Sequence, residues 1–259
     1  MEDSRGENRV PVIYGYGSLG QLANEVFDKF WIDIEMVIDR HPGRAASLKQ
    51  VTRDIKKDCL CVVCIATTPY HDIYQYLKKR GWRNMINVYD IFDRHPEFGI
   101  TSGWRTGPSS REDLVSARYV TDRFYDNTSM THWYSFKAWH TLRQEVSRGL
   151  IDKYFPQVIT LPSTLADIEA RRKVIVYPDE PMEEVSIHAE GCELETIEKN
   201  LALFQKYRPK LKVACYHTRD GLWKIERTLM EALEDYRWDF RVYSYQGQAA
   251  YLYGSPTER

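Results

Sequence analysis

Residues 185–197 read VSIHAEGCELETI and predict a β-strand that runs directly into a helix. Side chains two apart on a strand share a face, so His188 and Glu190 are expected to project together. Gly191 permits a sharp turn, and Glu193 follows in the first helical turn, where free N–H groups and the helix dipole favour a carboxylate. We therefore expect one imidazole and two carboxylates to lie close together at the end of this strand.

A second strand is predicted at Leu211–Tyr216, and His217 follows it. We expect the two strands to be parallel neighbours joined by the helix Glu193–Tyr207, which brings their carboxyl ends to the same edge of a sheet. Open α/β sheets bind their ligands at this edge. The candidate catalytic residues are therefore His188, Glu190, Glu193 and His217.

The candidate residues are imidazoles and carboxylates, which are the types of ligand that zinc and non-haem iron use. The metal ligands would be His188, Glu190 and His217. The alternative interpretation is a hydrogen-bonded polar cluster at the strand ends. The sequence leaves both interpretations open.

A glycine-rich turn near the N-terminus has the pattern G-x-G-x-x-G. It lies between a predicted strand, Val10–Tyr14, and a predicted helix, Gln21–Phe30, where such a turn lets backbone N–H groups approach a phosphate. The next strand, Ile34–Ile38, leads to an acidic residue at about the 20-residue distance at which a carboxylate meets a ribose. This pattern predicts a nucleotide or dinucleotide site, and a turn that serves packing alone is the alternative. The predicted cofactor-binding residues are Gly15, Gly17, Ser18, Leu19, Gly20, Asp39 and Arg40.

The Rossmann-like N-terminal domain is expected to span residues 1–98, and a helical docking region residues 99–149. The docking region contains two predicted helices, Glu112–Tyr125 and Met130–Val146. The second helix carries an aromatic stripe that we expect to dock two domains or the two subunits of a homodimer. The stripe consists of Met130, Trp133, Phe136, Trp139 and Leu142.

The C-terminal domain is expected to span residues 150–259. It begins with predicted strands at Val158–Leu161 and Val174–Tyr177. It ends with an antiparallel hairpin of Tyr236–Tyr245 and Ala249–Tyr253. The predicted fold class is α/β, with two Rossmann-like parallel-sheet units that are joined by aromatic-rich helices and closed by this hairpin.

The composition excludes several classes of partner. Lys and Arg number 36 against 37 Asp and Glu, for a net charge of -1, so no overall field attracts nucleic acid or an anionic membrane. No apolar run approaches the roughly 18 residues of a membrane span, and Met1–Asn8 is too polar for a signal peptide. We expect a soluble cytoplasmic protein with a small-molecule or sugar substrate. The cysteines require no disulfide, and Cys59, Cys61 and Cys64 are expected in the core.

Two regions resemble known families. Residues 10–95 resemble the small Rossmann-like domain that precedes some sugar-modifying transferases, on the stretches Val12–Gly20 and Val37–Pro42. Residues 185–253 resemble the C-terminal half of FkbM-type S-adenosylmethionine-dependent methyltransferases. This second resemblance rests on Ile187–Glu195, where the family has Asp-x-Glu-Gly-x-Glu, and on Tyr216-His217, Leu222-Trp223, Asp235-Tyr236 and Arg241-Val242-Tyr243.

The FkbM resemblance implies methyl transfer from S-adenosylmethionine to a hydroxyl of a sugar or small natural product, with His188 or His217 as the base. The sequence departs from the family at His188, which replaces an aspartate, at Gly221, which replaces an acidic residue, and at Val242, which replaces a histidine. Residues 150–184 contain no glycine and are too few for the family's strand–loop–helix units of about 30 residues each. The C-terminal half is therefore expected to be truncated and to lack the usual cofactor loop.

Three functions follow from these observations. The first is a methyltransferase in which the glycine-rich turn supplies the site for S-adenosylmethionine, with NAD or a nucleotide sugar as alternative ligands. The second is an enzyme that depends on a divalent metal. The third is a non-catalytic module that binds a nucleotide sugar.

Overall fold

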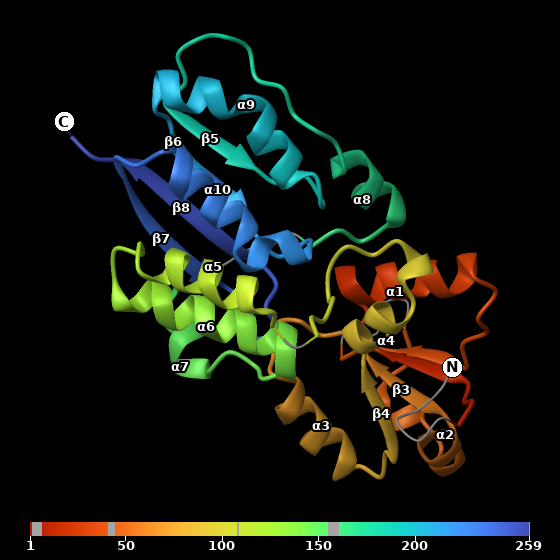
Figure 1. Cartoon of the computed structure of the whole chain (residues 1–259). Coiled ribbons are helices and arrows are strands. Elements are labelled where there is room, and N and C mark those ends of the chain that lie inside the picture. The colour runs from red at the N-terminus through yellow and green to blue at the C-terminus, as the bar shows by residue number, and fades with distance from the viewer. Residues whose placement is uncertain (2–6, 41–44, 108, 155–160, 259) are drawn as a thin grey trace. The chain divides into compact units, whose positions relative to one another are not determined.

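The buried apolar runs of the sequence form strands that assemble into two four-stranded sheets (Figure 1). The structure is a computed structural model that describes residues 1, 7–40, 45–107, 109–154 and 161–258. The chain divides into a first unit, Met1–Ile100 with Thr160–Ile168, and a second unit, Thr101–Ile159 with Glu169–Arg259. One sheet is parallel and the other is mixed, which confirms the predicted α/β class. Across the described ranges, no helix is both long and apolar enough to cross a membrane.

The first unit contains a parallel sheet with the strand order β2-β1-β3-β4. Its central strands, β1 (Pro11–Tyr14) and β3 (Leu60–Val63), are buried along their whole length, as apolar strands of parallel sheets are. The outer strands are β2 (Met36–Ile38) and β4 (Asn84–Asn87). The helices are α1 (Ser18–Lys29), α2 (Arg53–Asp58), α3 (Tyr70–Lys78) and α4 (Val88–Arg94), of which α2 and α4 are too short for the sequence to predict them from periodicity.

The second unit contains a mixed sheet with the strand order β5-β6-β8-β7. Strands β5 (Glu184–Ile187) and β6 (Lys210–Ala214) are parallel, and α9 (Glu193–Tyr207) joins them as the sequence predicts. Strands β7 (Tyr236–Val242) and β8 (Ala250–Pro256) form the predicted antiparallel hairpin. The remaining helices of this unit are α5 (Arg111–Thr121), α6 (Asn127–Leu142), α7 (Arg148–Tyr154) and α10 (Lys224–Ala232). Helix α8 (Leu165–Arg171) begins in the first unit and ends in the second.

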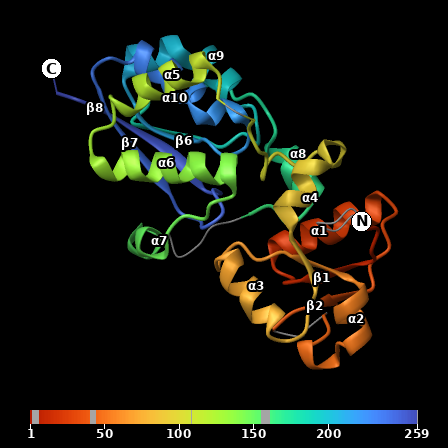
Figure 2. The same ribbon diagram turned by 60° about the horizontal axis from the view of Figure 1, so that its bottom comes forward.

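The aromatic stripe of α6 packs inside the second unit. Helix α6 covers one face of the mixed sheet, while α9 and α10 cover the other (Figure 2). Trp133, Phe136 and Trp139 are buried, and the ring of Phe136 lies 5.6 Å from that of Phe240 on β7. Leu142 departs from the predicted stripe, because the helix ends there and 72% of this residue is exposed. The burial of the three aromatic residues therefore serves the core of this unit.

The predicted strand Val174–Tyr177 is wrong, because these residues join no sheet. Their backbone N–H groups instead bond to side chains of α9: Ile175 N donates to Thr196 Oγ1 at 3.1 Å, and Tyr177 N donates to Asn200 Oδ1 at 2.8 Å. A helix thus satisfies backbone donors that a neighbouring strand would otherwise satisfy. The predicted strand at Val158–Leu161 falls mostly outside the described residues.

The third glycine of the glycine-rich turn provides a test of the first unit. A Cβ on Gly20 would overlap the carbonyl oxygen of Gly15, whereas a Cβ on Gly17 would meet nothing within 4 Å. Gly20→Ala is therefore expected to destabilise this unit by about 2 kcal/mol, the usual cost of overpacking. Gly17→Ala is the matched control and should leave the thermal unfolding of the unit unchanged. Equal melting temperatures for the two variants would contradict the close helix–strand packing at Gly20.

Candidate functional site

The carboxyl ends of β5 and β6 carry the candidate site within the second unit. The two strands pair with Ile187 opposite Val213, so the residues that follow them emerge at the same edge. The chain then turns through Glu190, whose φ of 44° is left-handed, and Gly191, whose φ is 105°. A left-handed conformation costs a non-glycine residue about 1 kcal/mol or more, and such strain gathers at functional sites. The turn directs the Glu190 carboxylate back towards the strand ends.

The structure brings His188, Glu190 and His217 into one cluster. One potential ligand atom from each residue lies within 4.8 Å of the others, and the two imidazole rings are 4.9 Å apart. The Nε2 atom of His217 lies 3.4 Å from Glu190 Oε2, and the Nε2 atom of His188 lies 3.5 Å from Glu190 Oε1. Ligands held tetrahedrally at about 2.1 Å from a metal ion are roughly 3.4 Å apart, so these separations suit an ion.

Two atoms of this cluster are buried without a hydrogen-bond partner in the described part of the chain: His217 Nε2 and Glu190 Oε1. His217 Nδ1 lies 2.7 Å from Glu193 Oε1, and a carboxylate only accepts, so Nδ1 carries the proton. The lone pair of Nε2 then points towards Glu190. Buried polar atoms without partners cost about 1–3 kcal/mol each, so the geometry favours a ligand between them.

Glu193 lies behind the cluster and holds it in place. Its Oε1 accepts the backbone N–H of Ala189 at 2.8 Å, and its Oε2 accepts that of Gly191 at 2.9 Å. Burial alone would raise the pKa of Glu193, but the hydrogen bonds that its carboxylate accepts from His217 and from the Ala189 N–H hold that pKa below its usual value. A carboxylate that orients a metal-binding imidazole is a recurrent arrangement in metal sites. Glu193 is therefore placed to orient His217.

Glu190 is held by a residue that the sequence analysis does not identify. Thr101 Oγ1 donates to Glu190 Oε2 at 3.0 Å, and Arg171 Nη1 lies 4.0 Å from Glu190 Oε1. Burial alone would raise the pKa of Glu190, but His188, His217 and Thr101 outweigh it and lower that pKa. Thr101 falls in a predicted linker, and nothing local in the sequence connects it to a glutamate far along the chain.

Two tyrosines border the cluster. Tyr216 Oη lies 3.4 Å from His188 Nε2, and the Tyr251 ring lies 5.9 Å from that of Tyr216 and 6.3 Å from that of His188. Burial raises the pKa of both phenols, so each remains a neutral donor or acceptor. The His188 side chain is 29% exposed, which leaves the cluster open to a substrate on this side. Tyr216 has a sequence signal, because it immediately precedes His217.

The glycine-rich turn lies in the first unit, between β1 and α1. Added Cβ atoms on Gly15 and Gly20 would overlap neighbouring atoms, so the close packing of the turn requires glycine at both positions. Gly17 is open and precedes Ser18 and Leu19 at the start of α1, where no side chain caps the helix. Asp39 Oδ2 accepts the backbone N–H of Tyr16 at 2.6 Å, so this carboxylate braces the turn. Arg40 is exposed beside it.

The cysteines are free thiols. Cys59, Cys61 and Cys64 are buried, as predicted, and burial raises the pKa of each thiol. Cys215 is buried behind the candidate site, and Cys192 is half-buried at the start of α9. A thiol with a raised pKa is a poor nucleophile and a poor metal ligand at neutral pH, so none of them adds to the cluster.

No protein-family model and no curated protein sequence matches the chain. Among solved structures, the chain is similar to the crystal structure of the methyltransferase FkbM from Methylobacillus flagellatus KT, with a TM-score of 0.59. The similarity covers 96% of this chain and 91% of that one, at 12% sequence identity. At this identity the likeness concerns the fold, which is methyltransferase-like over nearly the whole chain.

Proposed function

We propose that this chain is a metal-dependent enzyme in which His188, Glu190 and His217 bind one divalent cation of the zinc or iron(II) class. The single observation that carries this proposal is that two buried atoms, His217 Nε2 and Glu190 Oε1, have no hydrogen-bond partner among the described residues, although each lies 3.4–3.5 Å from another atom of the cluster. A polar cluster that served stability alone would pair these atoms with each other at normal hydrogen-bond length. Two imidazoles and one carboxylate leave coordination positions for water or substrate.

The chemistry of such a centre is the activation of an oxygen atom. A bound cation of this class lowers the pKa of a coordinated water or hydroxyl. The residues of the chain perform the remaining tasks: Glu193 holds the tautomer of His217, and Thr101 holds the carboxylate of Glu190. Tyr216 is buried, and its neutral phenol lies 3.4 Å from His188 Nε2, where it helps to position that imidazole.

Metal binding is tested first on the wild-type protein. After removal of metal by a chelator, titration with Co²⁺ is expected to give visible absorption bands of a site with nitrogen and oxygen ligands, at one ion per chain. Zn²⁺ should then displace the Co²⁺ and abolish the bands. Absence of the bands at millimolar Co²⁺ would overturn the proposal.

A second candidate function is methyl transfer from S-adenosylmethionine to a hydroxyl of a sugar or small natural product, which the FkbM-like fold favours. The hydroxyl oxygen would form a bond to the methyl carbon while the carbon–sulfur bond breaks, with the electron pair passing to sulfur. The hydroxyl proton would pass to His188 Nε2, the more exposed of the two imidazoles. The products would be the methyl ether and S-adenosylhomocysteine.

Ligand binding at the glycine-rich turn of the first unit is tested separately, by calorimetry with S-adenosylmethionine, NAD and a UDP-sugar. Gly17→Val is expected to abolish binding of whichever ligand the wild type binds, because its side chain would enter the open space where a phosphate or carboxylate meets the start of α1. The fold should persist, since that space is empty. Binding without turnover would favour the nucleotide-sugar module, and no binding below millimolar concentration would mean that the turn serves packing alone.

A further inference from the structure

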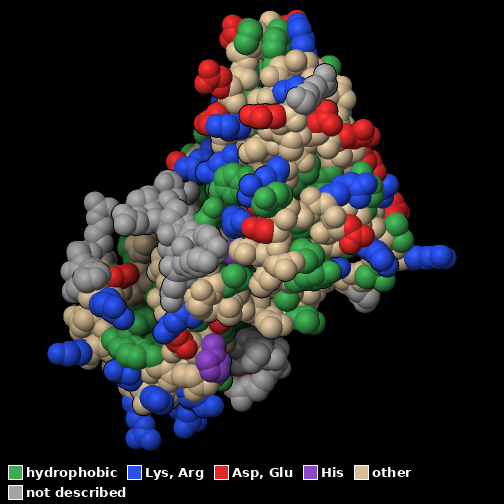
Figure 3. All heavy atoms as spheres, turned by 90° about the vertical axis from the view of Figure 1, so that its left-hand side faces the viewer, with side chains coloured by type: hydrophobic (Ala, Val, Ile, Leu, Met, Phe, Trp, Pro, Cys, Tyr) green, Lys and Arg blue, Asp and Glu red, His purple; other side chains and the backbone are tan. Residues whose placement is uncertain are grey.

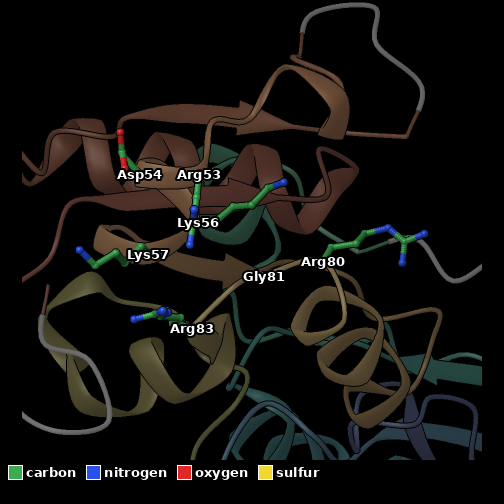
Figure 4. A pocket seen from close by; sticks show the side chains of 7 residues that line it. All are labelled: Arg53, Asp54, Lys56, Lys57, Arg80, Gly81 and Arg83. Atoms are coloured by element: carbon green, nitrogen blue, oxygen red, sulfur yellow. The ribbon is translucent and has the colours of Figure 1, made fainter.

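Five cationic side chains line one open pocket of the first unit, which has a volume of about 560 Å³ (Figure 4). Figure 3 shows Lys and Arg side chains gathered in its lower part, where Figure 1 places α2 and α3. The pocket contains a single carboxylate, that of Asp54, and no aromatic side chain. The cations are Arg53, Lys56 and Lys57 from α2, Arg80 from the end of α3, and Arg83 just before β4.

These charges are poorly neutralised by the protein itself. Arg53, Lys56 and Arg83 form no ion pair with any residue that the structure describes, and Lys57 has only a 3.9 Å contact with exposed Asp58. The Arg80 guanidinium stacks on the ring of Tyr76 at 3.5 Å and donates to the Tyr76 carbonyl oxygen at 3.3 Å, and neither contact supplies a negative charge. Like charges gathered in one concave surface raise the local potential and attract anions. This local excess of positive charge contrasts with the net charge of the whole chain, which is -1.

The backbone beneath the pocket is fixed. Arg83 N donates to the carbonyl oxygen of Lys56 at 3.2 Å, and the amide of Asn84 donates to that of Lys57 at 2.8 Å. Asn84 is buried at the start of β4. These bonds join α2 to β4, so the stems of the cationic side chains keep their spacing. A site formed in advance pays less entropy when a ligand binds.

The pocket is separate from the glycine-rich turn. Residues of α2 precede β3, and Arg83 precedes β4, so the pocket lies at the amino edge of the parallel sheet. The glycine-rich turn follows β1 and lies at the carboxyl edge. A ligand held at one edge therefore leaves the other free.

We propose that this pocket binds a small anion that carries at least two phosphate groups. Guanidinium groups match phosphate oxygens in pairs, and lysines add point charges around them. A volume of this size suits a small ligand, and the lack of aromatic side chains removes the stacking that single-stranded nucleic acid uses. The inference does not depend on the proposed metal centre.

Inorganic triphosphate is the probe for the pocket, measured by calorimetry at low salt and at about 0.15 M salt. The wild type is expected to bind it at low salt, with weaker binding at higher salt. The double variant Arg53→Gln with Arg83→Gln should bind at least tenfold more weakly. Its melting temperature should be unchanged, because both side chains are exposed and neither forms an ion pair with a described residue. Lys56→Gln is a second, milder variant that should weaken binding in the same direction.

The control removes the same amount of charge elsewhere in the unit. Lys29→Gln with Lys49→Gln alters two exposed lysines outside the pocket, and it should bind triphosphate within twofold of the wild type. Equal weakening by control and pocket variants would mean that a diffuse field attracts the anion, and it would overturn the proposal. No binding by the wild type at low salt would also overturn it.

A UDP-sugar and a short oligothymidylate test which class of phosphate-bearing molecule the pocket binds. A UDP-sugar that loses affinity in the Arg53→Gln/Arg83→Gln variant, but not in Gly17→Val, would support an organic diphosphate in this pocket. A UDP-sugar that loses affinity in Gly17→Val, but not in Arg53→Gln/Arg83→Gln, would instead bind at the glycine-rich turn. The pocket would then bind inorganic phosphates. Tighter binding of a short oligothymidylate than of triphosphate would overturn the proposal in favour of nucleic acid.

Discussion

Replacing His217 by alanine is expected to lower the affinity of the chain for Zn²⁺ at least 100-fold. The change removes Nε2, the buried lone pair that faces Glu190 at 3.4 Å, and no other described imidazole replaces it. A loss of this size corresponds to about 2.7 kcal/mol of binding free energy. Competition with a fluorescent zinc chelator measures it directly. Wild-type zinc affinity in His217→Ala would show that the cluster does not hold the ion.

Glu193, which contacts His217 Nδ1, provides a second test in which a smaller loss of zinc affinity is expected. Glu193→Gln keeps an acceptor for His217 Nδ1 but loses one of the two backbone N–H bonds that fix the turn. Loss of such an orienting group typically costs 10–100-fold in metal affinity. The matched control is Glu195→Gln, two residues along the same helix, where the carboxylate is exposed and paired with Lys199. The control should bind zinc as the wild type does.

The stability of the metal-free protein separates a binding site from a structural polar cluster. His188 is partly exposed, so His188→Ala should remove metal while leaving the melting temperature of the metal-free protein nearly unchanged. In a structural cluster, the same change would deprive the buried Glu190 of a partner and destabilise the fold by about 1–3 kcal/mol. The two measurements together therefore decide between the interpretations.

Glu226→Gln is expected to stabilise the second unit, and the gain should increase with pH. Glu226 lies on α10 with no exposed surface, and its carboxyl lies near the Trp133 indole, but neither carboxyl oxygen forms a hydrogen bond of normal geometry with a described residue. Burial raises the pKa of this carboxyl well above its usual value of 4.5, so the folded protein keeps the proton. The unfolded chain releases it above that value. The wild type therefore loses stability as the pH rises above about 4.5, by up to about 1.4 kcal/mol per pH unit until the folded pKa is reached.

Glutamine occupies the same space and has no proton to lose, so the variant avoids this penalty. Urea unfolding at pH 6 and pH 8 measures the difference between the two proteins, which should be larger at pH 8. The control is Glu231→Gln on the same helix, where the exposed carboxylate pairs with Arg227 and should change stability by about 0.5 kcal/mol or less. A Glu226→Gln gain that does not change with pH would show that the carboxylate is already ionised in the folded state.

The sequence predicts the core of the candidate site because that part depends on local periodicity. Alternation in β5, the apolar run of β6 and the helix between them place His188 and His217 at neighbouring strand ends, and the structure places them there. Thr101 and Tyr251 are different, because they reach the cluster through tertiary packing. Tyr251 arrives through the antiparallel pairing of β8 with β6, which places it opposite Ala214. Strand order of this kind has no short-range signal.

One error has a physical cause in competing hydrogen bonds. Val174–Tyr177 has the composition of a strand, but two of its backbone N–H groups donate to Thr196 and Asn200 on α9. These N–H groups are therefore not free to pair with a neighbouring strand. The side chains of α9, more than twenty residues along the chain, therefore determine how this apolar segment is used. The role of Asp39 in ligand binding stays a prediction, and in the structure its carboxylate accepts the backbone N–H of Tyr16 in the glycine-rich turn.

Helix α9 carries Glu193, Thr196 and Asn200 at spacings of three and four, so all three lie on one side of the helix, and all are buried. Each offers an oxygen atom to the backbone of another segment. Substitutions on this side of the helix have a different constraint from those on an apolar core face. A leucine there would fill the space but leave a buried backbone N–H group without an acceptor, so only short side chains with an acceptor oxygen are compatible with these positions. In related sequences, these three positions should vary among Glu, Asp, Asn, Ser and Thr and exclude aliphatic residues, a polar signature by which distant members of the group would be found.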